Sequence, residues 1–437
     1  MKIHSTHCSA VPYTDDAIAW GRRFADLDGF VLLDSRKGDK GSGRYDIITA
    51  LPDRRFLVSD FAGNASQWMD AIEEAVHRTA PPSSRLAVGF LDFETATSST
   101  LGIPCEPLQS AVAAIYSWYL LQDHFERKSW IVMDPQIAPE IASEVARRMD
   151  SEHHKNIYDF DVKQCFTSDI SEVDYVKKVN EVRQLIVAGD CYQANIAQRF
   201  TSRYSGSEFG MYMALRNVAP GDYSAFLGLM PNHAVISLSP ERFLSIDGRN
   251  IHSQPIKGTR PRFADAAEDA ASARALLDSE KDRAENIMIV DLLRNDLGHL
   301  CVAGSVHVSE ICALYSYDNV HHLVSRIEGS LRHEVTAGTA LIAASPGGSI
   351  TGAPKKRAVE IIKSLETAPR GAYCGSIFAL TSQGWLESSI AIRTLEAVEG
   401  QLNCWGGGGI TWDSVPEEEY RETLHKVSAF MVALETQ

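Results

Sequence analysis

Lys257 is the residue whose type and setting first suggest chemistry. It lies between Ile256 and Gly258, just after a strand-like run. A lysine with apolar neighbours can lose its proton, and the neutral amine is then a nucleophile. Most lysines are solvated surface charges, so the local sequence leaves open whether Lys257 is a nucleophile or an ordinary surface residue. Glu241 ends a Ser-Pro-Glu run after another strand-like segment, where it is either a positioned acid or a turn residue.

Carboxylates occur on two predicted helices, at residues 279–298 and 416–434. Glu285 shares a face of the first helix with apolar residues, where an unpaired charge is costly. Glu419 and Glu422 lie three residues apart on one face of the second. Carboxylates converging from two helices form the oxygen-rich site that Mg²⁺ prefers. The alternative, a solvated acidic face, is favoured for residues 417–419 taken alone but not for Glu285.

Three further features are suited to anions or to a ring. The four glycines at 406–409, which include Gly407 and Gly408, predict a turn whose free N–H groups could cradle a carboxylate, although a merely tight turn is equally compatible. Arg393 interrupts an apolar strand predicted at 388–394, and a buried arginine needs an anionic partner. His322 and its neighbour His321 should point to opposite faces of a strand, so only one can face a shared pocket.

These residues need elements to position them, and the pattern predicts an α+β fold. Strands are predicted at 29–35 and 44–51 around a glycine-rich loop at 37–43, and helices at 108–122 and 173–188. Because strands and helices do not strictly alternate, a doubly wound parallel sheet is disfavoured. A polar joint near residue 168 predicts two regions, 1–167 and 168–437.

Bulk composition excludes several classes of function. The 437 residues carry a formal net charge of −15, which argues against a nucleic-acid surface but leaves room for a locally basic pocket. No apolar run is long enough to span a membrane, and no secretory signal is visible. The eight cysteines form no C-x-x-C pair, which indicates reduced thiols and a cytoplasmic protein.

The order of the motifs resembles the chorismate-utilising enzymes, which include anthranilate synthase component I, aminodeoxychorismate synthase component I, isochorismate synthase and salicylate synthase. The resemblance is dense from residue 190 to 427 and loose over the first 165 residues. The segments that carry it are Ser-Pro-Glu (239–241), Pro-Ile-Lys-Gly-Thr (255–259), Asp-Arg-Ala-Glu-Asn (282–286), Val-His-His-Leu-Val-Ser (320–325), Pro-Gly-Gly-Ser-Ile-Thr-Gly-Ala-Pro-Lys (346–355), Ile-Arg-Thr (392–394) and Glu-Tyr-Arg-Glu-Thr (419–423).

The resemblance implies antiparallel sheets packed as a sandwich with helices outside, an active site in a cleft, chorismate as substrate and Mg²⁺ as cofactor. It also implies a role for each matching residue. Glu285 and Glu422, with Glu419 close by, are the implied metal ligands; Arg393, Gly407, Gly408 and Tyr373 are the implied grip on the enolpyruvyl carboxylate; His322 lies over the ring and Thr259 contacts the substrate.

Lys257 makes the chain similar to aminodeoxychorismate synthases, since anthranilate synthases usually have a small residue at this position. The implied reaction begins when Lys257 adds to C2 while Glu241 protonates the departing C4 hydroxyl. Ammonia then attacks C4, giving 4-amino-4-deoxychorismate for p-aminobenzoate and folate synthesis. No G-x-C-x-G turn is present, so a separate glutamine amidotransferase subunit is the implied source of ammonia.

Several alternatives remain open at this stage. Anthranilate synthase component I is the nearest rival, followed by isochorismate or salicylate synthase and by a non-catalytic relative that only binds a metabolite. In the N-terminal region, Ser35, Arg44 and Tyr45 occur in segments that resemble a tryptophan-binding site. The sequence leaves open whether tryptophan binds there and whether it regulates.

Overall fold

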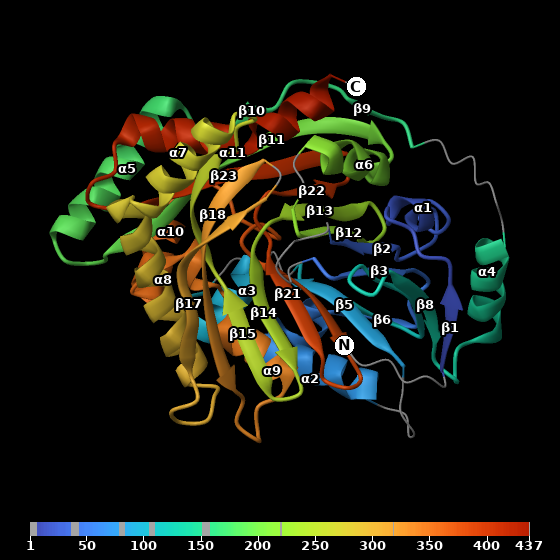
Figure 1. Ribbon diagram of the computed structural model, residues 1–437. Helices are drawn as coiled ribbons and strands as arrows, with labels where there is room; N and C mark the ends of the chain where they lie inside the picture. The colour runs from blue at the N-terminus through green and yellow to red at the C-terminus, as the bar shows by residue number, and fades with distance from the viewer. Residues whose placement is uncertain are drawn as a thin grey trace.

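Two apolar runs near the N-terminus pair as the sequence predicts. Strand β2 (Val31–Asp34) lies antiparallel to β3 (Tyr45–Thr49), with Leu32 opposite Ile48. Figure 1 shows this pair inside a large sheet of the computed structural model. The structure describes residues 7–35, 43–77, 84–104, 110–150, 158–218, 221–317 and 319–436. Residues 37–42 of the predicted glycine-rich loop lie outside the described residues.

The first sheet has thirteen strands in the described part of the chain, and all of its pairings are antiparallel. In spatial order it runs through β1 (Cys8–Val11), β8 (Lys128–Met133), β7 (Trp118–Asp123), β3, β2, β12 (Tyr223–Met230), β13 (His233–Ser239), β22 (Thr394–Val398), β23 (Gln401–Ile410), β11 (Gln193–Gly206) and β10 (Thr167–Ser168). Two short strands, β9 (Phe160–Val162) and β19 (Gly352–Ala353), also pair with β11.

The second sheet has ten strands among the described residues, again antiparallel throughout. Its order is β16 (Ile256–Pro261), β18 (Val320–Ser330), β15 (Asn250–Gln254), β14 (Arg242–Asp247), β21 (Leu386–Ile390), β20 (Ser376–Thr381), β5 (Leu86–Leu91), β6 (Val112–Tyr116) and β4 (Arg54–Leu57), with β17 (His307–Ser316) paired to β18.

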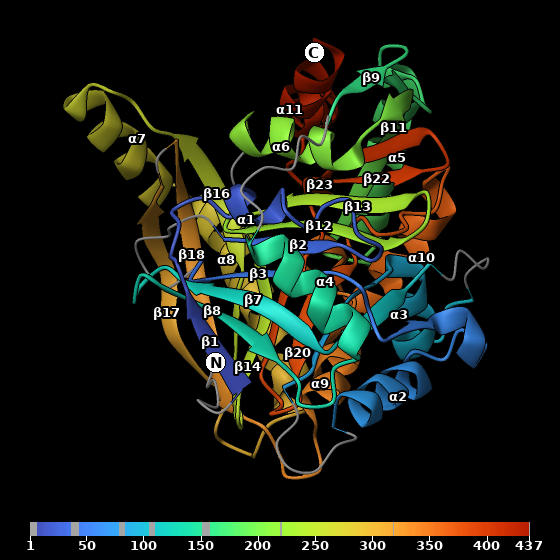
Figure 2. The ribbon, with the colours of Figure 1, turned by 90° about the vertical axis from the view of Figure 1, so that its right-hand side faces the viewer.

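The two sheets pack face to face, and helices cover their outer faces, so the expected α+β sandwich is confirmed. The core between the sheets contains Val31 and Leu121 from the first and Val88 and Ile377 from the second. The helices over the first sheet are α1 (Ile18–Gly21), α4 (Pro139–Asp150), α6 (Glu208–Val218) and α11 (Pro416–Glu435). Those over the second are α2 (Ala65–His77), α3 (Phe93–Leu101), α8 (Glu280–Gly298) and α9 (Ala337–Ala344). Figure 2 shows α6 and α11 at one end of the molecule and α2 and α9 at the other.

Three more helices complete the described fold, and the first of them agrees with the sequence prediction. Helix α5 (Glu172–Val187), predicted at 173–188, packs with α10 (Lys355–Leu365) against β11. Helix α7 (Ala266–Leu277) precedes α8 and contacts β16 and β18. No helix within the described ranges is both long and apolar enough to cross a bilayer.

The helix predicted at residues 108–122 is wrong. Strands β6 and β7 occupy residues 112–123, and every residue of both strands is buried. A strand covered on both faces has no polar face, so its apolar residues match a helical period by chance. The predicted division at residue 168 remains a prediction; strands from both sides of it share both sheets.

Candidate active site

Lys257 lies near the start of β16, at the edge of the second sheet where β16 pairs with β18. Its Nζ donates a hydrogen bond to the main-chain oxygen of Ser349 at 3.2 Å. Burial lowers the pKa of Lys257, although the nearby carboxylates of Glu241 and Glu285 oppose the shift. The neutral form of the amine is therefore more favoured at this position than it would be in water.

Glu241 lies in the short link between β13 and β14 and is 6% exposed. Burial raises its pKa, while a hydrogen bond from the Ser349 side chain and the charge of Lys257 act in the opposite direction. The structure thus brings the predicted acid and the predicted nucleophile together, with Ser349 contacting both. A carboxyl group with a raised pKa can hold a proton for donation near neutral pH.

The Ser349 segment is a short 3-10 helix, Gly348–Ile350, that three side chains hold in place. Asn195 on β11 donates its side-chain N–H to the Ser349 oxygen at 2.8 Å. Arg370, only 1% exposed, donates to the Ile350 oxygen at 3.1 Å. Leu292 of α8 packs where a Cβ on Gly348 would lie, so only glycine allows this close approach.

The predicted metal ligands come from helices α8 and α11. Ser279 caps α8, and Glu285 lies six residues further along the chain. Burial raises the pKa of Glu285, with Lys257 opposing the shift. Glu419 is 6% exposed and accepts a hydrogen bond from the Ser414 hydroxyl at 2.6 Å. Burial also raises the pKa of Glu419. The Ser414 hydroxyl therefore binds Glu419 rather than capping the helix, whose N-cap is Val415.

Glu422 behaves differently because a lysine pairs with it. Burial would raise its pKa, but Lys426, Lys281 and Lys257 lower it overall. Lys426 Nζ lies 2.6 Å from Glu422 Oε1 and also donates to the Gly407 oxygen at 2.8 Å. Lys426 is not among the residues predicted for the site, although its i,i+4 spacing from Glu422 on a helix predicts this contact.

The glycine turn predicted at residues 406–409 is wrong: these residues continue β23. Gly407 and Gly408 pair with Ala197 and Ile196 of β11. A Cβ on Gly408 would lie 2.9 Å from Glu419 Oε2 and 3.5 Å from Glu422 Oε1. Glycine is therefore needed at position 408 because α11 brings its carboxylates against the strand. Strand β22 pairs with β23 only as far as Cys404, so this end of β23 has β11 as its paired strand.

His322, Thr259 and Arg393 form a second group beside Lys257. His322 Nδ1 and Thr259 Oγ1 are 2.8 Å apart across the β16–β18 pair. Burial, with Arg393 nearby, lowers the pKa of His322 to about 4, so its imidazole is neutral at physiological pH. His321 faces the other way and contacts Ser316 and Asp269.

Arg393 lies in the break between β21 and β22 with φ +51°, not within a strand as predicted. Burial lowers its pKa, and no carboxylate contributes to that shift. Among the described residues no ion pair or side-chain hydrogen bond engages its guanidinium. A half-buried guanidinium in this state is suited to an anionic ligand.

Tyr373 is placed by aromatic packing before β20. Its ring stacks on Trp405 of β23, with centroids 5.7 Å apart and an interplanar angle of 4°. The guanidinium of Arg370 lies 5.8 Å from the Tyr373 ring centroid, and Glu366 pairs with Arg370. The charge of Glu241 contributes to the raised pKa of Cys374, the next residue in the chain, so this segment lies near the predicted acid.

The N-terminal residues that resemble a tryptophan site already have protein partners. Ser35 donates from its N–H and its hydroxyl to Asp46, at 2.7 and 3.0 Å. Arg44 pairs with Asp123 at 2.7 Å, and its guanidinium lies 4.9 Å from the Tyr45 ring. Burial raises the pKa of Tyr45 to about 12. The tryptophan site stays a prediction.

The chemistry of the donor set fits Mg²⁺. The charge of Glu422 acts on both Glu285 and Glu419, and all three side chains offer only oxygen, the donor that Mg²⁺ prefers. Within the described ranges no three His, Cys, Asp or Glu side chains form a preassembled metal cluster. This is compatible with Mg²⁺, which usually takes one or two protein carboxylates and keeps several waters.

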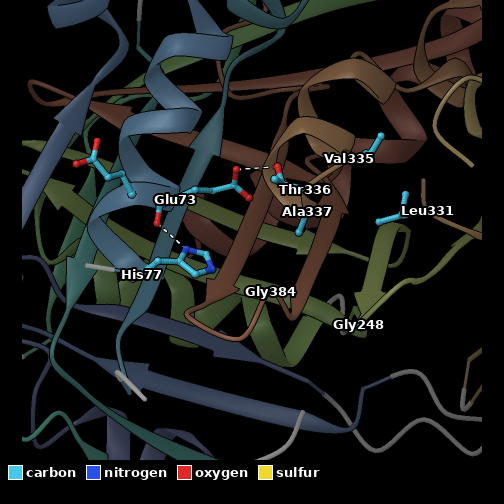
Figure 3. Close-up of a pocket in the computed structure, with 9 residues that line it drawn as sticks. Glu73, His77, Gly248, Leu331, Val335, Thr336, Ala337 and Gly384 are labelled. Atoms are coloured by element: carbon cyan, nitrogen blue, oxygen red, sulfur yellow. Dashed lines mark hydrogen bonds between the residues drawn. The ribbon is translucent and has the colours of Figure 1, made fainter. Parts of the chain in front are cut away.

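A hollow of about 340 Å³ lies elsewhere, between α2 and α9 (Figure 3). Glu73 there accepts hydrogen bonds from Thr336 and Gly338 at the start of α9. None of the predicted site residues lines it. The cleft expected beside Lys257 remains a prediction.

Comparison with known proteins identifies the family. A family model described as chorismate binding enzyme matches residues 28–432. The chain belongs to the chorismate-binding enzymes. Aminodeoxychorismate synthase component 1 of Escherichia coli (strain K12) is 44% identical over 445 residues, covering 96% of both chains. The protein of the same name from Klebsiella aerogenes is 42% identical over 331 residues, covering 75% of this chain and 72% of its own.

A solved member of the family has the same fold. The anthranilate synthase component I from Streptococcus pneumoniae TIGR4 superposes with a TM-score of 0.74 and 27% identity, over 99% of this chain and 93% of its own. The resemblance seen in the sequence is therefore confirmed for both family and fold. In this chorismate-binding enzyme, the half-buried amine of Lys257 and the buried acid Glu241 both contact Ser349.

Proposed function

We propose that the chain is the aminating component of an aminodeoxychorismate synthase, which converts chorismate and ammonia to 4-amino-4-deoxychorismate. The observation that carries the proposal is Lys257, a half-buried amine with a lowered pKa beside the buried acid Glu241. The name shared by relatives 44% and 42% identical supports the same reaction. The product would serve p-aminobenzoate and folate synthesis.

The residues account for each bond change. The neutral amine of Lys257 forms a bond to C2 of the ring, the two ring double bonds shift, and the C4–oxygen bond breaks. Glu241 gives its proton to the departing hydroxyl, which leaves as water. Ammonia then bonds to C4, the double bonds shift back, and the amine of Lys257 is expelled. The new ammonium group returns one proton to Glu241, so the site is restored.

The remaining residues would bind and orient chorismate. Glu285, Glu419 and Glu422 would hold Mg²⁺, which when bound withdraws charge from the ring carboxylate. Arg393 would pair with the enolpyruvyl carboxylate, since its guanidinium is half-buried without a carboxylate partner in the described residues. Tyr373 and the N–H groups beside Gly407 and Gly408 would complete that contact, and His322 with Thr259 would lie against the ring.

Anthranilate synthase is the less favoured alternative. Its ammonia attacks C2, and an amine already placed on that side of the ring would block the attack. The structural match to an anthranilate synthase component I fits the fold of both enzymes and does not separate them. The discriminating feature is the side chain at position 257.

Ammonia would come from a separate glutamine amidotransferase subunit, as the words "component 1" in the relatives' name suggest. The test is to incubate the chain with chorismate, Mg²⁺ and either ammonium or glutamine, and to identify the product by mass spectrometry. We expect 4-amino-4-deoxychorismate with ammonium and no product with glutamine alone. Anthranilate as the product would refute the assignment, and turnover of glutamine by this chain alone would refute the need for a partner.

A further inference from the structure

Ser349 contacts both the amine and the acid of the proposed reaction. Its main-chain oxygen accepts a hydrogen bond from Lys257 Nζ at 3.2 Å. Its side chain makes a hydrogen bond with the carboxyl group of Glu241. Lys257 comes from β16 and Glu241 from the β13–β14 link, and the pairing of Arg242 with Gln254 brings these two segments close in the second sheet. The pairing fixes the main chain but not how the two side chains are oriented.

We propose that Ser349 is a positioning residue that sets the Lys257 amine and the Glu241 carboxyl group relative to each other. The carbonyl oxygen orients the amine toward the ring, and the hydroxyl orients the carboxyl group. This inference rests on the proposed function, because it assigns Ser349 a part in the same reaction.

The surroundings of Ser349 are built to hold it still. Ser349 is 7% exposed. The side chain of Asn195 donates a second hydrogen bond to the Ser349 carbonyl oxygen at 2.8 Å, and Arg370 donates to the carbonyl oxygen of Ile350. Downstream, β19 pairs with β11, where Ala353 lies opposite Gln193. Fixed dipoles of this kind act without reorganising during the reaction, which is the condition for effective positioning.

The hydroxyl has a specific role in proton transfer. When Glu241 gives up its proton it becomes a buried carboxylate, and the Ser349 hydroxyl donates to that charge. Removing the hydroxyl should therefore slow proton donation and raise the pKa of Glu241. The other titratable groups facing Glu241 are Lys257 and the Cys374 thiol, and neither can replace a hydroxyl donor fixed by the main chain.

The test compares Ser349→Ala with Ser349→Thr. Ser349→Ala keeps the carbonyl oxygen and removes the hydroxyl, so kcat for amination with ammonium should fall by roughly 10- to 100-fold, the range for a hydrogen bond to a charged group. KM for chorismate should change by less than about threefold, since the hydroxyl binds Glu241 and not the substrate. The alkaline limb of the kcat profile should move to higher pH, and Ser349→Thr should restore much of kcat.

The matched control is Ser345→Ala in the same segment. Ser345 is 1% exposed, and its hydroxyl donates to the Leu341 oxygen at 2.8 Å, away from both groups. Its loss should leave kcat and the pH profile unchanged. Wild-type kcat and pH profile in Ser349→Ala, or equal losses in both variants, would overturn the inference. If instead the wild-type chain makes no 4-amino-4-deoxychorismate, the proposed function fails first.

Discussion

At the scale of the residue, Lys257 carries an amine where its charge is disfavoured. In the unfolded chain its proton stays bound up to a pH of about 10.4, whereas burial lowers the pKa in the fold. Between those two pKa values the unfolded chain binds more protons, so this group makes the folded state more stable as pH rises. A residue with this cost is expected where function needs it.

Replacing Lys257 with methionine should therefore stabilise the protein and inactivate it. We expect the Tm of Lys257→Met to exceed that of the wild type at pH 7, and the gain to shrink at pH 9.5. Amination of chorismate should fall by at least about 10³-fold, as for loss of other nucleophiles. Thermal unfolding at the two pH values checks the first point. A lower Tm at pH 7 would mean that the charged lysine stabilises the fold.

His322 offers a second residue-scale test. Its pKa is lowered to about 4 by burial and by Arg393, so the imidazole should stay neutral and keep its contact with Thr259. Because the unfolded chain binds this proton more tightly, the free energy of unfolding decreases only as pH falls below the unfolded pKa of about 6.5. NMR of ¹³C-labelled histidine should show a constant His322 signal from pH 5.5 to 8, assigned by its loss in His322→Asn. An inflection near pH 6.5 would contradict the burial argument.

At the scale of the element, helix α11 packs against the end of strand β23. The Cα of Gly408 has no side chain, which leaves room for the carboxylates of Glu419 and Glu422. Gly408→Ala should displace at least one of them, because the added Cβ would lie 2.9 Å from Glu419 Oε2. We expect the rise in Tm caused by millimolar Mg²⁺ to be lost and the Mg²⁺ concentration for half-maximal activity to increase about tenfold or more.

Gly298→Ala is the matched control for that experiment. Gly298 ends α8, and a Cβ built on it meets no atom within 4 Å. Its response to Mg²⁺ should equal that of the wild type. An unchanged response in Gly408→Ala would show that these carboxylates do not bind the ion.

The elements also show how far the sequence alone could lead. Helices α5, α8 and α11 were predictable because each has one apolar face and a clear beginning. Strands β6 and β7 were not, because residues buried on both faces show no period. Gly407 and Gly408 were read as a turn since four glycines give no sign of the helix that packs against them.

Some residues of the candidate site could likewise be identified from the sequence, and others could not. Lys257 and Glu285 were identifiable as charged residues in apolar settings. Ser349 was not, because its contact with Lys257 uses a main-chain carbonyl, which every residue carries. Its partner Asn195 comes from β11, more than 150 positions earlier, and only the folded chain brings the two together.

At the scale of the whole molecule, the two halves of the chain are interleaved. Strand β5 pairs with β20 along six residues, and β2 pairs with β12, so both sheets cross the predicted boundary at residue 168. A fragment of residues 168–437 would expose the core between the sheets and two unpaired strand edges. We expect this fragment to be insoluble or to lack a cooperative thermal transition, whereas the full chain unfolds cooperatively. A soluble fragment with a sharp transition would establish residues 168–437 as an independent domain.

The interleaving matters for the reaction, because Arg370 binds Ile350 beside Ser349 while Glu94, from the first half of the chain, binds the Arg370 and Gly371 N–H groups. The site therefore depends on both halves of the molecule.

The central claim is that Lys257 forms a bond to chorismate, and mass spectrometry of the Lys257 peptide tests it most directly. The enzyme is mixed with chorismate and Mg²⁺ without ammonium, quenched and digested. We expect an adduct of chorismate minus one water on Lys257. The adduct should disappear, with release of 4-amino-4-deoxychorismate, when ammonium is added before the quench. An unmodified Lys257 in enzyme that aminates chorismate at full rate, or full-rate amination by Lys257→Ala, would contradict the account.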